Sequence, residues 1–161
     1  MKLSEWFDYQ FRCTLDGFMW AVEQVPKERL YLPASDRLGG WAVIQHVVHV
    51  LDYEERYALP SMTQWLGVPP AIPEESEQKS GPLPPILEEQ LSEFEQVRWA
   101  EINMLAKFKD NDWKKFCKTP FWGEVSLYWL ASKTYQHTLE HTNNILSIAL
   151  FWDTKIKHGS H

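Results

Sequence analysis

The chain has few of the residues that would place it in several common protein classes. Its 161 residues include 2 cysteines, Cys13 and Cys117, too few for a disulfide framework. We expect no transmembrane helix, because no run of 18 apolar residues is present, and the first residues do not resemble a signal peptide. The formal net charge of -6 disfavours nucleic-acid and acidic-membrane partners. The prediction is therefore a soluble, cytoplasmic single domain.

Large aromatic side chains are abundant, with 9 Trp, 8 Phe and 6 Tyr. A disordered chain would be poor in such residues, so this content indicates a folded core. The length suits a single domain over residues 1–161.

Proline is unevenly distributed along the chain. Six of the 10 prolines lie between Pro69 and Pro85, while glycine occurs 7 times in all. The segment 68–85 is too rich in proline for the interior of a helix or strand. The parts of the chain before and after this segment are each short for a domain that folds alone. We therefore expect the segment to be a long connection inside one domain.

Apolar residues recur at helical spacing in four runs, which predict helices over 3–25, 41–59, 85–109 and 126–152. Pro26 and Pro60 are expected to end the first two helices, and Ser126 is a candidate N-cap for the last. The stretch 110–125 suits a short hairpin or an extended segment. The prediction is an all-α four-helix bundle with the proline-rich connection between helices 2 and 3.

Two histidines interrupt the apolar stripe of the last predicted helix. His137 and His141 are four residues apart, so their imidazoles project from one face. Burying them costs free energy unless each is hydrogen-bonded or binds a metal. Helical zinc sites use this spacing. Two core histidines held by polar neighbours are the alternative.

The second predicted helix offers a third metal ligand, which a catalytic site usually needs. On a helical wheel, His49 shares a narrow polar stripe with Gln45, Asp52 and Arg56. His46 is the weaker ligand candidate: it lies about 60° from His49, beside Tyr53 and Tyr57, and we expect it to be a partly exposed residue at this aromatic edge. Asp52 can orient His49 or act as a catalytic base; pairing with Arg56 is the equal alternative.

The sequence resembles the DinB/YfiT-like family in four segments: 39–45, 49–52, 119–126 and 137–141. Members are four-helix bundles that bind a metal through three histidines. Carried over by position, the resemblance implies His49, His137 and His141 as ligands. The residues at 142–145 depart from many relatives, which have a basic or small residue and a glutamine there.

The resemblance implies a metal-dependent enzyme that activates a low-molecular-weight thiol, such as bacillithiol, mycothiol or glutathione, for S-transfer to an electrophile. A hydrolase with a metal-bound water, and a non-catalytic metal-binding or stress-associated protein, are the alternatives. The ion is a divalent metal, with zinc, nickel, iron and manganese all open. A small-molecule substrate and a homodimer are also implied. We expect Trp41, Phe121 and Trp122 to wall the cleft around the metal, and Cys13 and Cys117 to be idle thiols.

Overall fold

The first helix follows from its apolar repeat. The computed structural model, which describes residues 2–70 and 84–153, has α1 over Leu3–Glu23. Phe7, Phe11 and Phe18 on its inner face are fully buried. The helix ends three residues before Pro26, which has no N–H to donate and cannot continue a helix. The helix predicted over 3–25 is confirmed with a slightly earlier end.

The last two long helices also match their predicted runs. α4 spans Leu87–Leu105 and α5 spans Leu127–Phe151. Ser126 caps α5, because its side-chain oxygen accepts a hydrogen bond from the backbone N–H of Trp129 at 3.1 Å.

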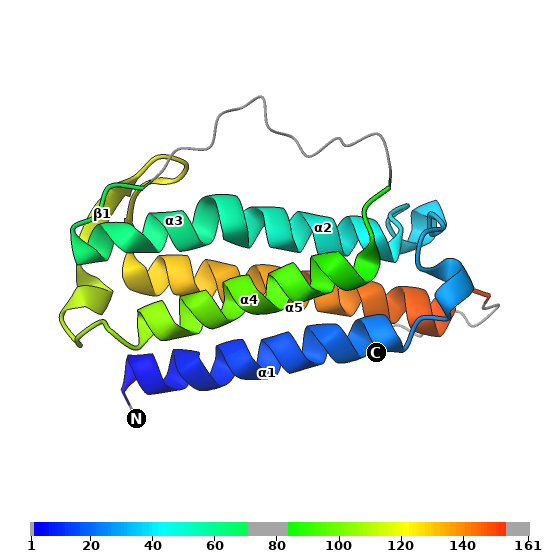
Figure 1. The fold of residues 1–161 in the computed structure, drawn as a ribbon, viewed down its shortest axis with the longest axis horizontal. Coiled ribbons are helices and arrows are strands. Elements are labelled where there is room, and N and C mark those ends of the chain that lie inside the picture. Colours follow the sequence, from blue (N-terminus) through cyan, green and yellow to red (C-terminus); the bar gives the residue numbers. More distant parts are fainter. Residues whose placement is uncertain (1, 71–83, 154–161) are drawn as a thin grey trace.

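The prediction that Pro60 ends the second helix is wrong. α2 (Val43–Tyr53) continues into a π-helical turn, η3 (Glu54–Ala58), then into α3 (Leu59–Met62) and η4 (Thr63–Leu66). Figure 1 shows these elements as one continuous helical rod. Pro60 lies in the first turn of α3, where a missing N–H is tolerated, and the π-turn before it has already broken the regular hydrogen-bond pattern.

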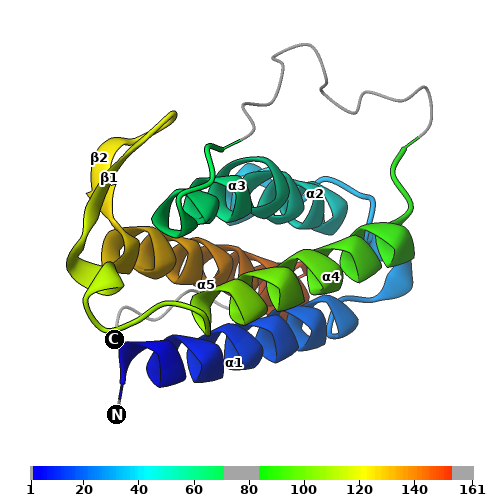
Figure 2. The same ribbon diagram turned by 60° about the vertical axis from the view of Figure 1, so that its left-hand side comes forward.

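The stretch between α4 and α5 was predicted to form a short hairpin or an extended segment, and it contains a short hairpin. β1 (Phe116–Thr119) pairs antiparallel with β2 (Gly123–Ser126), with Phe116 opposite Ser126. Figure 2 shows the hairpin at the end of the molecule where α5 begins. Because β2 runs directly into α5, the hairpin fixes where that helix starts.

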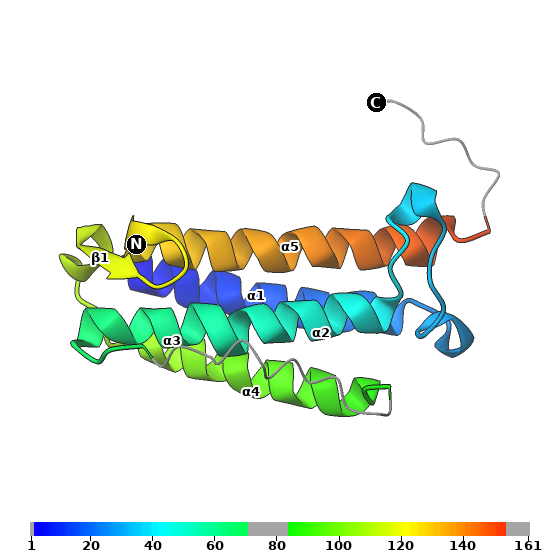
Figure 3. The same cartoon turned by 90° about the horizontal axis from the view of Figure 1, so that it is seen from above.

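The long helices pack with α1 against α4 and α5, and α2 against the same two helices. Figure 3 shows α2 and α5 side by side along their length. The predicted all-α class is confirmed as a mainly helical fold with one small hairpin in the described residues. No helix among residues 2–70 and 84–153 is long and apolar enough to cross a membrane. Most of the proline-rich connection, residues 71–83, lies outside the described residues.

A buried charged cluster joins the π-turn to α4 and α5. Arg98 of α4 donates to a carboxylate oxygen of Glu54 and to the hydroxyl of Thr138, and its Nε lies 3.7 Å from a Glu101 oxygen. All four side chains are fully buried. Burial and the neighbouring Glu54 carboxylate raise the pKa of Glu101 well above its usual range. A protonated Glu101 leaves Glu54 and Arg98 as a charge-balanced pair.

Replacing Arg98 with Met should therefore destabilise the protein by about 3–5 kcal/mol, because it leaves the Glu54 carboxylate buried without its counter-charge. Replacing Glu101 with Gln should cost much less, since the amide resembles the protonated carboxyl in size and charge. Urea unfolding of both variants at pH 7 measures the difference. Equal losses of stability in the two variants would show that Glu101 is ionised.

Candidate metal centre

The start of α2 is set by a tight turn and a side-chain cap. Gly39 and Gly40 have φ of 93° and 74°, in the left-handed region that glycine adopts without a Cβ penalty. The Gln45 side chain accepts a hydrogen bond from the backbone N–H of Ala42 at 2.8 Å, which satisfies an otherwise unpaired donor at the helix start. These contacts position the first turns of α2, which carry His46 and His49, beside α5.

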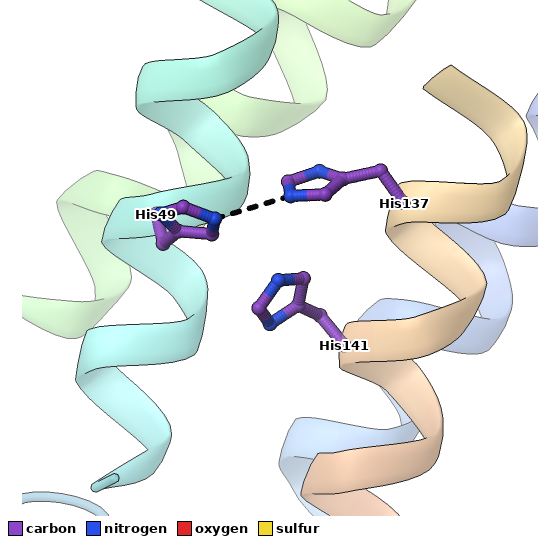
Figure 4. Close-up of side chains that lie close together, drawn as sticks. All are labelled: His49, His137 and His141. Atoms are coloured by element: carbon purple, nitrogen blue, oxygen red, sulfur yellow. Dashed lines mark hydrogen bonds between the residues drawn. The ribbon is translucent and has the colours of Figure 1, made fainter. Parts of the chain in front are cut away.

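The three predicted ligands come together between α2 and α5. His49, His137 and His141 each place a ring nitrogen within 4.8 Å of the others. The Nε2 atoms of His49 and His137 lie 3.1 Å apart, and the ring centroids of the three residues are 4.7–5.0 Å apart. Figure 4 shows a ring nitrogen of His141 turned toward the other two rings.

This geometry suits a shared ion. Two nitrogens bound to one ion at about 2.1 Å, at angles between octahedral and tetrahedral, lie roughly 3.0–3.4 Å from each other. The Nε2 separation of 3.1 Å between His49 and His137 falls in that range. Imidazole nitrogens bind zinc, nickel, iron and copper readily. The three histidines can therefore hold a divalent metal.

Two of the histidines that face this space, His137 and His141, are held in their neutral form. Burial, and then the neighbouring imidazoles, lowers the pKa of His137 to about 4 and that of His141 to about 3. At pH 7 both rings are neutral, which is the form that binds a metal.

His46 does not occupy the position predicted for it. It is only 4% exposed, and its Nδ1 lies 2.8 Å from Nδ1 of His141. The helical wheel placed it outside the polar stripe of α2, but α5 and Trp41 pack over that side of the helix and bury it. The sequence did contain a signal, because His46 lies one turn before His49.

Asp52 forms an ion pair with Arg56 at 3.1 Å, and its side chain is 43% exposed. This is the i, i+4 pairing left open as the alternative to a role with His49; a catalytic role for Asp52 remains a prediction. Glu140, between the two histidines of α5 in sequence, is exposed and accepts a hydrogen bond from Gln136, and it is not part of the histidine cluster. Cys13 and Cys117 are free thiols outside the histidine cluster.

Aromatic rings line both sides of the cluster. Trp41 contacts His46, His49 and His141, with ring centroids 5.2–6.0 Å apart. On the other side, the Tyr53 ring lies 4.2 Å from His137. The predicted contribution of Trp41 to the wall is confirmed by these contacts.

The other two predicted wall residues lie further out. Trp122 contacts Tyr53 at 6.0 Å between ring centroids, and so reaches the cluster through that tyrosine. Phe121 packs on Tyr57 and Trp122. Both belong to the turn of the hairpin, so this loop covers the end of the site nearest Tyr53.

An open pocket of about 380 Å³ adjoins the cluster on the side of Trp41. His46 and His141 line it together with polar groups of Arg37, Asn144 and Ser147. The volume suits a small molecule.

The comparison with known families agrees with the geometry. The family model of the DinB superfamily matches residues 10–145, and the chain belongs to this superfamily. The comparison with curated proteins found no match. The matched region includes all three histidines of the cluster.

Replacing His137 with Ala should abolish stoichiometric metal binding, because two remaining imidazoles hold a divalent ion far more weakly; we expect a loss above about 100-fold in affinity. Metal analysis of untagged protein, after dialysis against one equivalent of zinc, measures this. Circular dichroism checks that the variant is folded.

A matched control replaces His158 and His161 near the end of the chain with Ala. This double variant should keep its metal. Stoichiometric metal in the His137 variant would remove that residue from the ligand set.

Proposed function

We propose that the protein is a metal-dependent enzyme in which His49, His137 and His141 hold a divalent ion that activates a low-molecular-weight thiol for S-transfer to an electrophile. The observation that carries this proposal is the all-imidazole composition of the cluster. Three neutral ligands leave the charge of the ion uncompensated. When bound, the ion supplies Lewis acidity that lowers the pKa of a thiol or water in contact with it.

The surroundings of the cluster support an enzyme rather than a closed structural site. His49 is exposed, so solvent and small molecules have access to the cluster. The pocket beside His141 combines the Trp41 ring with polar side chains, a composition typical of small-molecule sites. A structural zinc site would instead be closed by a fourth protein ligand.

The proposed reaction balances without a further reactant. The thiol loses its proton, its sulfur forms a bond to an electrophilic carbon, and the leaving group departs with the electrons of the broken bond. The proton leaves to solvent through the open side of the site. Trp41 covers one side of the cluster and suits an apolar part of the electrophile.

The contacts of α1 and α2 with both α4 and α5 also support the four-helix bundle that we infer for this chain. In such a bundle, metal and cofactor sites are built from facing helices. His49 on α2 faces His137 and His141 on α5 in this way.

Product formation from a panel of electrophiles should require both a metal and a thiol. The assay compares bacillithiol, mycothiol, glutathione and no thiol, using zinc-loaded and chelator-treated protein. At least one thiol should give turnover. The His137→Ala variant should lose about 100-fold or more of this activity, because losing a metal ligand reduces activity more than losing a residue that only hydrogen-bonds to a ligand.

The other outcomes each point to a different function. Turnover of the same electrophiles without any thiol would contradict S-transfer and indicate a hydrolase using bound water. Absence of turnover under every condition, with metal bound, would support the non-catalytic alternative.

A further inference from the structure

A fourth histidine contacts the cluster from outside. His46 lies one turn before His49 on α2, and its Nδ1 is 2.8 Å from Nδ1 of His141. The other ring nitrogen of His141 faces His49 and His137 (Figure 4). The two nitrogens of His141 therefore have different partners, one inside the candidate metal site and one outside it.

Metal binding by His141 would determine which of the two imidazoles donates in the hydrogen bond between His46 and His141. A hydrogen bond between two ring nitrogens contains one proton. When His141 binds a metal through Nε2, its own proton is on Nδ1, so Nδ1–H of His141 donates and Nδ1 of His46 accepts. His46 must then carry its proton on Nε2, which is buried and has no hydrogen-bond partner among the described residues. The contact thus selects one tautomer for each ring.

Packing holds His46 in the orientation that this bond needs. The backbone N–H of His46 donates to the carbonyl of Ala42 in the first turn of α2. The Trp41 ring packs against His46 at 5.2 Å and lies nearly parallel to His141, with an interplanar angle of 23°. His46 and His141 are therefore held by the same tryptophan.

His137 has no equivalent support. Among the described residues, its Nδ1 is buried without a hydrogen-bond partner. The tautomer and ring orientation of His137 are thus left to packing against Tyr53. The outer contact of His46 is specific to His141.

We infer that His46 is a positioning residue, which accepts a hydrogen bond from Nδ1–H of His141 and so holds Nε2 of His141 toward the metal. The inference rests on the metal centre proposed above but not on the thiol chemistry. Outer partners of this kind typically contribute 10–100-fold to metal affinity, by fixing the tautomer and orientation of the ligand.

Two substitutions separate the hydrogen bond from packing. His46→Leu removes the acceptor and keeps an apolar side chain of similar bulk. His46→Asn places an amide oxygen near the position of Nδ1 and keeps an acceptor. Val47→Ala, at a buried apolar neighbour on the same helix, is the control for packing alone.

The primary measurement is zinc affinity of untagged protein, by competition with a chromophoric chelator. We expect His46→Leu to weaken zinc binding about 10–100-fold, and His46→Asn to recover most of that loss. Val47→Ala should leave zinc affinity close to that of the wild type.

A second measurement detects the proton on Nδ1 of His141 directly. In zinc-loaded wild type, nitrogen-15 NMR should show a slowly exchanging Nδ1–H on His141. The signal should persist in His46→Asn and disappear by exchange in His46→Leu.

A loss below about threefold in His46→Leu, well under the usual 10–100-fold, would overturn the inference, as would equal losses in the Leu and Asn variants. The measurement uses no thiol and no electrophile, so its result is independent of the proposed catalytic activity. A wild type that binds no zinc would overturn both the metal centre and the role of His46.

Discussion

The contact between α2 and α5 depends on finding partners for polar side chains in the middle of the molecule. Apolar residues hold both ends of α5, but its centre carries Thr134, His137 and Thr138 in buried positions. A buried polar group without a partner costs free energy. Thr134 donates to the Leu130 carbonyl of its own helix, whereas His137 and Thr138 have partners on the facing helices. His49 meets His137, and Glu54 and Arg98 meet Thr138. These pairings fix the register of α5 against the other helices.

The histidine cluster and the buried charged cluster lie next to each other, and the charged cluster includes the first residue of the π-turn, Glu54. His49 lies within the regular part of α2, while Glu54 begins the π-turn that follows. The extra residue in a π-turn rotates all later side chains relative to an α-helix. This rotation accompanies the burial of Glu54, a charged residue that is then held by Arg98 from α4. Thr138, the residue after His137, accepts a hydrogen bond from Arg98. The charged cluster therefore also anchors the turn of α5 that carries His137.

The sequence predicted the helices and the shared face of His137 and His141 because both depend on spacing along one chain segment, whereas the family resemblance implied His49 as the third ligand. Phe7 and Phe11 repeat at helical intervals, and His137 and His141 share a face by the same rule. His46 was misplaced because a wheel for one helix contains no information about the α5 and Trp41 side chains that cover it. The continuation of the helix through Pro60 depends on the π-turn, for which no local spacing rule exists. Arg98 could not be assigned to the core, since its burial requires partners from two other helices.

The proposed metal centre binds a divalent ion through three histidine imidazoles and keeps an open position for a small molecule. X-ray absorption spectroscopy of the zinc-loaded, untagged protein tests this most directly. We expect three imidazole nitrogens at about 2.0–2.1 Å from the zinc, with a light-atom ligand completing the coordination. A sulfur ligand at about 2.3 Å, or fewer than three imidazoles around the zinc, would contradict it.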